Sequence, residues 1–171
     1  MDRSAVHEEM ERVRVSFHEL LTNASRTDLR RKSAGTRWNN KQLLFHMLLG
    51  FLIIRALRTL VVIFSRLPEP VGRTFAQFLN AATVPFDAMN FAGSWLAGTV
   101  LPRRALLRLF DRVIASLHRR LDRESDTNLA RTMHYPTRWD PFFRDVMTLA
   151  DVYRFPTRHF GFHQAQLSLA P

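Results

Sequence analysis

Residues 37–64 read RWNNKQLLFHMLLGFLIIRALRTLVVIF, and this stretch decides the fold class. Its apolar part, residues 43–64, is long enough to span a bilayer, for which about 20 residues suffice. Its interior, however, carries His46, Arg55 and Arg58, and one arginine at the centre of a span costs about 2.5 to 3.5 kcal/mol on insertion scales. The stretch is therefore predicted to be a buried helix of a helical bundle rather than a transmembrane helix.

The start of this helix is well defined by local signals. Asn39 is a candidate N-cap, and Gln42, three residues later, completes a capping box. Trp38 and Leu43 occupy the two positions of a hydrophobic staple. The helix is expected to end near Pro68 and Pro70, because proline cannot continue it. Its predicted inward stripe consists of Leu43, His46, Gly50, Ile53, Leu57 and Leu60.

Helical periodicity recurs in three further segments and predicts an all-α four-helix bundle. The first covers about residues 6–24, and the third covers about residues 103–123. The fourth is predicted to begin at Asp140 as N-cap with Pro141 in the first turn, and to be kinked at Pro156. Its inward stripe is expected to comprise Leu149, Val152, Pro156, His159, His163 and Leu167. No pattern favours a strand, and the length favours one domain over residues 1–171.

An apolar insert of about residues 68–102 separates the second and third helices. Its only charges are Glu69, Arg73 and Asp87, so it is too apolar for a solvated loop. Short helices broken by Pro85, Gly93 and Gly98, lying across one end of the bundle, are expected. The insert is interpreted as a dimer interface or extra core; the alternatives are a lid over a hydrophobic substrate or a patch that touches a membrane surface.

The composition limits the classes of function and the compartment. The net charge of +10 comes mainly from arginines that are dispersed along the chain, which argues against nucleic-acid binding. The chain has no cysteine, so a metal would need histidine or carboxylate ligands and a reacting thiol would come from a cosubstrate. The charged first residues do not resemble a signal peptide, and the cytoplasm is the expected location.

Three histidines lie on stripes that otherwise face the core. His159 and His163 are four residues apart near the end of the chain, and His46 lies on the second helix. With seven histidines in the chain, one such pair is weak evidence, but buried imidazoles need polar partners. Three neutral imidazoles would also leave open positions on a metal. Spacing and burial alone leave a metal site and hydrogen-bonded core histidines equally open.

Two segments resemble motifs of the DinB-like superfamily. RWNNKQLLFHMLLGF, residues 37–51, is similar to its second-helix motif, in which a tryptophan precedes a histidine by eight residues, here Trp38 and His46. MTLADVYRFPTRHFGFHQAQL, residues 147–167, is similar to its last-helix motif, with two histidines four apart followed by a glutamine, here His159, His163 and Gln166. The insert of about residues 68–102 looks longer than the usual link in this superfamily.

The resemblance implies a four-helix bundle in which His46, His159 and His163 hold a divalent metal such as zinc, nickel or iron. Characterised relatives include S-transferases that use bacillithiol or glutathione and a mycothiol-dependent isomerase. Gln166 is then either a hydrogen-bond partner that holds a ligand histidine in its tautomer or a capping or surface residue. A low-molecular-weight thiol such as mycothiol becomes a candidate cosubstrate.

Two functions of different classes follow. One is a metal-dependent enzyme, an S-transferase or a hydrolase, acting on a small molecule. The other is a non-enzymatic bundle that binds a hydrophobic ligand, a membrane surface or a protein partner, including a second copy of itself, through the insert. No catalytic residue is assigned, and sequence motifs of serine hydrolases, phosphate-binding loops and HExxH metalloproteases do not occur.

Overall fold

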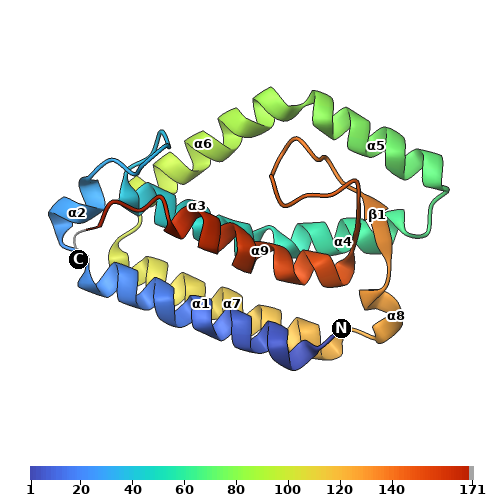
Figure 1. Cartoon of the computed structure of the whole chain (residues 1–171), viewed down its shortest axis with the longest axis horizontal. Helices are drawn as coiled ribbons and strands as arrows, with labels where there is room; N and C mark the ends of the chain where they lie inside the picture. The colour runs from blue at the N-terminus through green and yellow to red at the C-terminus, as the bar shows by residue number, and fades with distance from the viewer. Residues whose placement is uncertain (170–171) are drawn as a thin grey trace.

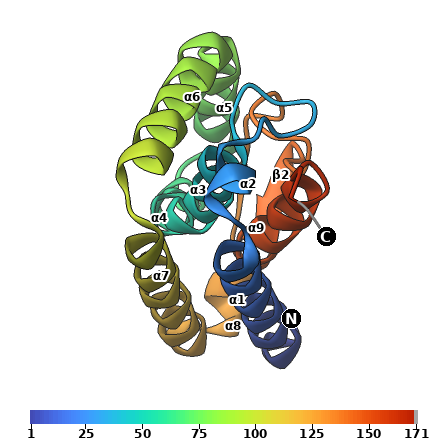
Figure 2. The same ribbon diagram turned by 90° about the vertical axis from the view of Figure 1, so that its left-hand side faces the viewer.

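Four helices surround one core in the computed structural model, which describes residues 1–169. They are α1 (Arg3–Asn23), α3 (Asn40–Leu52), α7 (Arg103–Arg123) and α9 (Leu149–Gln164). Contacts join α1 to α7, α7 to α3, α3 to α9 and α9 to α1, so the helices form a closed ring. In Figures 1 and 2, α1 and α7 lie below α3 and α9. The prediction of an all-α fold is confirmed.

The centre of the core is a cluster of phenylalanines, one from each of the four helices. Phe110 packs against Phe17 at 4.3 Å and against Phe51 at 5.1 Å between ring centroids, and Phe160 lies 6.4 Å from Phe17. All four rings are fully buried. Aromatic rings bury large apolar areas and prefer such tilted or edge-to-face contacts, so this cluster holds the four helices together.

The long apolar stretch forms two consecutive helices, not one. Its predicted capping box is present: Asn39 Oδ1 accepts from Gln42 N, and Gln42 Oε1 accepts from Asn39 N. Ile53 then separates α3 from α4 (Ile54–Phe64). α3 is buried along nearly its whole length, whereas α4 buries only Ile54 and Val61. Within the described residues, 40–64 is the only helical stretch whose length and composition would allow it to cross a membrane, and buried core helices share these properties.

The insert forms two helices that lie above α3, α4 and α9 (Figure 1). α5 (Glu69–Ala81) is followed by α6 (Thr83–Val100), which packs along α3. The expectation of short helices broken at Pro85, Gly93 and Gly98 is wrong. Pro85 lies in the first turn of α6, where backbone N–H groups have no helical partner to lose. Gly98 instead permits close packing, because a Cβ there would lie 2.5 Å from Gln42 Cα.

The start of the last helix also differs from the prediction. A short antiparallel ladder of β1 (Thr132–His134) and β2 (Val146–Thr148) precedes α9, and Thr148 is its N-cap, in a capping box with Asp151. Asp140 lies in the loop between the strands, where its Oδ1 accepts from Phe142 N at 2.8 Å. Aspartate before proline favours a turn as well as a helix start, and here it forms the turn.

The remaining helices are short connections. α2 (Arg26–Arg30) follows α1, and α8 (Asp126–Leu129) follows α7. Each starts at a serine, Ser25 or Ser125, whose side chain accepts a hydrogen bond from a backbone N–H of the first turn. α7 has the bounds that periodicity indicates, and the apolar residues that this periodicity places inward are buried: Leu106, Phe110, Val113, Leu117 and Leu121.

Candidate metal centre

The structure brings His46, His159 and His163 together. His46 comes from α3, and the other two come from successive turns of α9. One ring nitrogen from each histidine lies within 4.8 Å of the other two, and His46 Nε2 is 3.2 Å from His163 Nε2. The three imidazoles thus point their ring nitrogens at one small volume between α3 and α9.

Each of the three imidazoles makes a hydrogen bond to an oxygen atom through its Nδ1. His159 Nδ1 donates to Asp140 Oδ2 at 2.8 Å, and His163 Nδ1 donates to Gln166 Oε1 at 2.6 Å. His46 Nδ1 donates to Asn90 Oδ1, on α6, at 3.2 Å. These oxygens are acceptors, so the proton of each neutral imidazole is held on Nδ1 and the lone pair remains on Nε2.

This pattern fits a bound cation. With both Nδ1 atoms donating to oxygens, the Nε2 atoms of His46 and His163 face each other at 3.2 Å as two acceptors. His159 Nε2 is buried and has no hydrogen-bond partner within residues 1–169. Buried acceptors are normally satisfied, and imidazoles with an oxygen on the second nitrogen are the usual form of metal-ligating histidine. The histidines therefore suit a divalent metal that accepts nitrogen ligands.

Burial keeps two of these histidines neutral. Desolvation is the largest cause that lowers the pKa of His46, to about 2, and the neighbouring His159 and His163 lower it further. Desolvation also lowers the pKa of His163, to about 4. A metal competes with a proton for the same lone pair. Two of the three imidazoles are thus in the form that can bind a metal well below neutral pH.

Two partners of the histidines were not identified from the sequence. Asn90 lies in the insert and Asp140 was interpreted as a helix cap; nothing in their local sequence signals a role at the site. Of the two roles considered for Gln166, the structure shows the hydrogen bond to a candidate ligand histidine, His163. Trp38 packs on the hydrophobic core as a staple residue would, and its ring also stacks on His46 at 4.5 Å between centroids.

The other four histidines lie outside this centre and contact carboxylates. His7 bonds to Asp122, His18 to Asp111, His118 to Glu11 and His134 to Asp145, at 2.7 to 2.9 Å. His7 and His118 also stack on each other across the contact of α1 and α7. Apart from His134, which is 8% exposed, these residues are half-buried.

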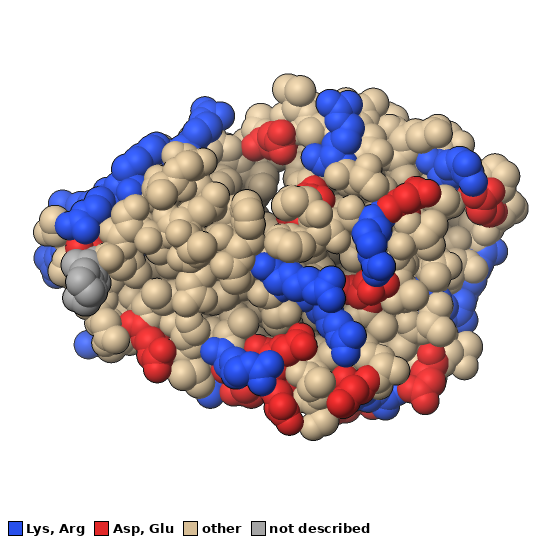
Figure 3. Space-filling model, viewed as in Figure 1, with Lys and Arg blue, Asp and Glu red and all other residues tan. Residues whose placement is uncertain are grey.

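An apolar cavity of about 370 Å³ opens beside the three-histidine centre. His46, His159, Asn90 and Asp140 line one part of it. The rest is lined by side chains of α3, α4, α6, α9 and the loop between the strands. The space-filling view shows the surface hollowed between α6 and this loop (Figure 3). A small molecule could therefore reach the histidines from this side.

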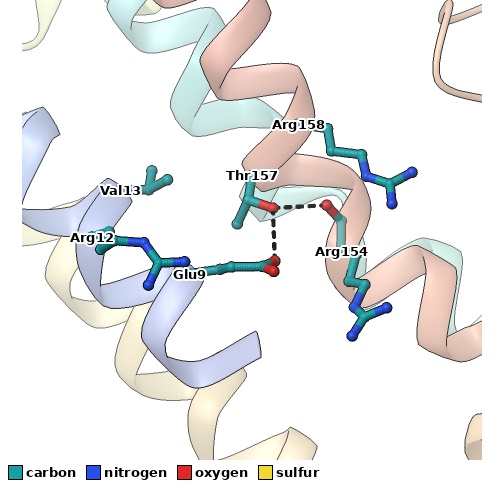
Figure 4. A pocket seen from close by; sticks show the side chains of 6 residues that line it. All are labelled: Glu9, Arg12, Val13, Arg154, Thr157 and Arg158. Atoms are coloured by element: carbon teal, nitrogen blue, oxygen red, sulfur yellow. Dashed lines mark hydrogen bonds between the residues drawn. The ribbon is translucent and has the colours of Figure 1, made fainter. Parts of the chain in front are cut away.

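A second hollow, of about 410 Å³, lies between α1 and α9 and lacks these features (Figure 4). Thr157 Oγ1 there donates to Arg154 O at 2.9 Å and lies 3.4 Å from Glu9 Oε2. The side chains of Arg154 and Arg158 extend away from Thr157 rather than toward a common point (Figure 4). This hollow is open, and none of the three histidines lines it, so it is separate from the three-histidine centre.

The fold and the site define a helical protein with a buried three-histidine centre suited to a metal ion. The chain belongs to the DinB superfamily, whose family model matches residues 9–167. Comparison with curated proteins and with solved structures gives no match. The match extends over both resembling segments and over the insert.

Proposed function

We propose that this protein is a metal-dependent enzyme, an S-transferase that uses a low-molecular-weight thiol or a hydrolase. A divalent metal, zinc, nickel or iron, is held by His46, His159 and His163. The observation that carries the proposal is the convergence of three imidazoles, with His46 Nε2 3.2 Å from His163 Nε2 and with His159 Nε2 buried without a hydrogen-bond partner within residues 1–169. A bound divalent cation would supply Lewis acidity and lower the pKa of a thiol or water molecule that reaches it.

The protein's own residues supply positioning in this proposal. Asp140, Gln166 and Asn90 hold the three Nδ1–H groups and so orient the rings. Ser94 Oγ lies 3.4 Å from His46 Nδ1 and supports the same ring from α6. The apolar walls of the cavity exclude water from one side, which strengthens the electrostatic interactions inside. We further propose that residues 1–171 act as one domain in the cytoplasm.

The test is a reaction screen on metal-loaded and chelator-treated protein. Mycothiol, bacillithiol and glutathione are offered with 1-chloro-2,4-dinitrobenzene for transfer, and p-nitrophenyl acetate is offered for hydrolysis. We expect turnover in one arm that is lost on chelation and in His163→Ala, and retained in His7→Ala, a histidine outside the centre. Turnover that survives both chelation and His163→Ala would contradict the proposal.

One observation favours a second candidate, a protein that binds a membrane surface or another copy of itself through the insert. Large apolar side chains are exposed on α5 and α6, including Phe78 at 68%, Val84 at 78% and Met89 at 69% exposure. Exposed apolar patches mark interaction sites. Sedimentation of the protein with phosphatidylglycerol vesicles tests binding to a membrane surface, and the mass of the protein in solution tests binding to a second copy. Metal-free protein should behave like metal-loaded protein in both experiments.

A further inference from the structure

We infer that the substrate of this centre has an uncharged, apolar body that occupies the cavity between α4, α6 and the loop of residues 135–145, with its polar reacting group at the histidines. This inference rests on the proposed function and names the class of substrate. It follows from the lining of the cavity, from the two histidines that it shares with the centre and from the way in which its roof is held.

The lining of the cavity is almost entirely apolar. Its volume of about 370 Å³ lies in the range of small-molecule sites, about 300 to 1,000 Å³. The apolar side chains that line it are Leu49, Ile53, Ala56, Leu57, Leu60, Phe86, Met89, Trp139, Phe143 and Phe155. Among the described residues, no lysine, arginine or glutamate lines it, and its one carboxylate, Asp140, already accepts from His159.

The cavity and the histidine centre share two of the three histidines. His46 and His159 belong to both, and Asn90, which holds His46, lies in the cavity wall. Several wall residues, among them Ile53, Leu57 and Leu60, are only half-buried. Covering such apolar surface with a ligand is favourable in proportion to the area removed from water. An apolar molecule seated there would present one end to the imidazoles of His46 and His159.

The insert and the loop build the roof of the cavity together. Phe86 of α6 stacks on Trp139 of the loop, with ring centroids 3.8 Å apart. Trp139 Nε1 donates to Leu79 O at 2.8 Å, and the backbone N–H of Arg138 donates to Asn80 Oδ1 at 3.0 Å. The loop is thus tied to the end of α5 as well as to the start of α6. These contacts make the insert a specificity element of the site.

The same lining excludes a charged occupant. Glutathione and similar thiols carry carboxylates, and burying a carboxylate without a cationic or hydrogen-bonding partner is costly. The cavity wall offers no such cation. A thiol cosubstrate therefore approaches the centre from outside this cavity, and the apolar cavity receives the second reactant.

The test measures how the affinity of a metal-binding probe depends on its apolar tail. Hydroxamates bind zinc, nickel and iron, so acetohydroxamate through octanohydroxamate are titrated into metal-loaded protein by calorimetry. We expect affinity to rise roughly fourfold per methylene until the cavity is filled, the value that corresponds to about 0.8 kcal/mol per buried methylene. Equal affinity for all chain lengths in the metal-loaded wild type would overturn the inference.

Two variants locate the effect. Ala56 is exposed and lines the cavity, so Ala56→Trp should abolish the gain with chain length while metal content and the melting temperature stay at the wild-type values. Ala92→Trp places the same side chain at an exposed position of α6 outside the cavity and should keep the gain. If the affinity of Ala56→Trp for hydroxamates still rises with chain length, the inference is also overturned.

A failure of the proposed function gives a different result. Metal analysis then shows no bound metal and no hydroxamate binds, which contradicts both the proposed function and the inference. Bound metal with tight acetohydroxamate binding and no dependence on chain length contradicts the apolar substrate alone.

Discussion

Removing the Asp140 carboxylate should weaken metal binding without unfolding the protein. Asp140 Oδ2 accepts from His159 Nδ1 at 2.8 Å, and the two side chains are only 9% and 8% exposed. Water screens this contact little, and the carboxylate holds the ring in the orientation and tautomer that a ligand needs. Loss of such a partner lowers metal affinity about 10- to 100-fold, or about 1.4 to 2.8 kcal/mol. We expect a loss in this range for Asp140→Ala.

The assay is competition for zinc with a chromophoric chelator, read alongside the far-ultraviolet circular dichroism spectrum. Asp145→Ala is the matched control, because Asp145 contacts His134 at 2.9 Å in the same way but outside the centre. We expect wild-type zinc affinity in this control. An unchanged affinity in folded Asp140→Ala, or an equal loss in Asp145→Ala, would refute the argument that Asp140 acts through His159.

Three further outcomes are expected. Gly50→Val should lower metal affinity, measured by the same competition, because even a Cβ at this position lies 3.1 Å from His159 Cδ2. Arg58→Ala should lower the free energy of unfolding in urea by about 3 kcal/mol, because it leaves buried Glu124 without its cationic partner; a loss below about 1 kcal/mol would contradict this. The metal-free protein should become less stable as the pH falls from about 6.5 toward 4, because His163 has a lowered pKa of about 4 and binds its proton more readily when unfolded. Urea melts across this range should show a smaller decline in His163→Ala, and an equal decline would count against this origin.

The parts of the fold that follow from local signals could be predicted from the sequence. The helix of residues 103–123 has its apolar side chains at helical spacing, and the structure has the same bounds. The capping box of Asn39 and Gln42 depends on residues three apart and is present. Such features depend on neighbours along the chain, so one sequence is enough to identify them.

The wrong predictions from the sequence concern segments whose local structure is determined by tertiary packing. Gly98 weakens an isolated helix, but in α6 it permits the close approach to Gln42 that packing on α3 requires. Asp140 has the local sequence of a helix start, yet the chain forms a ladder before α9 and leaves Asp140 in a loop. Both outcomes depend on residues far away in the sequence.

The candidate site, like the fold, could be predicted from the sequence only in part. The spacing and stripe positions of His46, His159 and His163 pointed to one shared location, and the structure brings them together. The oxygens of Asn90 and Asp140 reach the site from the insert and the loop, 44 and 19 residues away from the histidines that they contact. No local pattern relates such pairs, so the apolar cavity that these segments enclose was also not predictable in detail.

The metal content of untagged protein, purified without chelator, tests the central claim most directly. The measurement is elemental analysis of the wild type beside His163→Ala and His7→Ala, all prepared identically. We expect close to one zinc, nickel or iron ion per chain in the wild type and in His7→Ala, and loss of that ion in His163→Ala. Wild-type protein that stays metal-free after each of these ions has been offered, with unchanged thermal stability, would contradict the account.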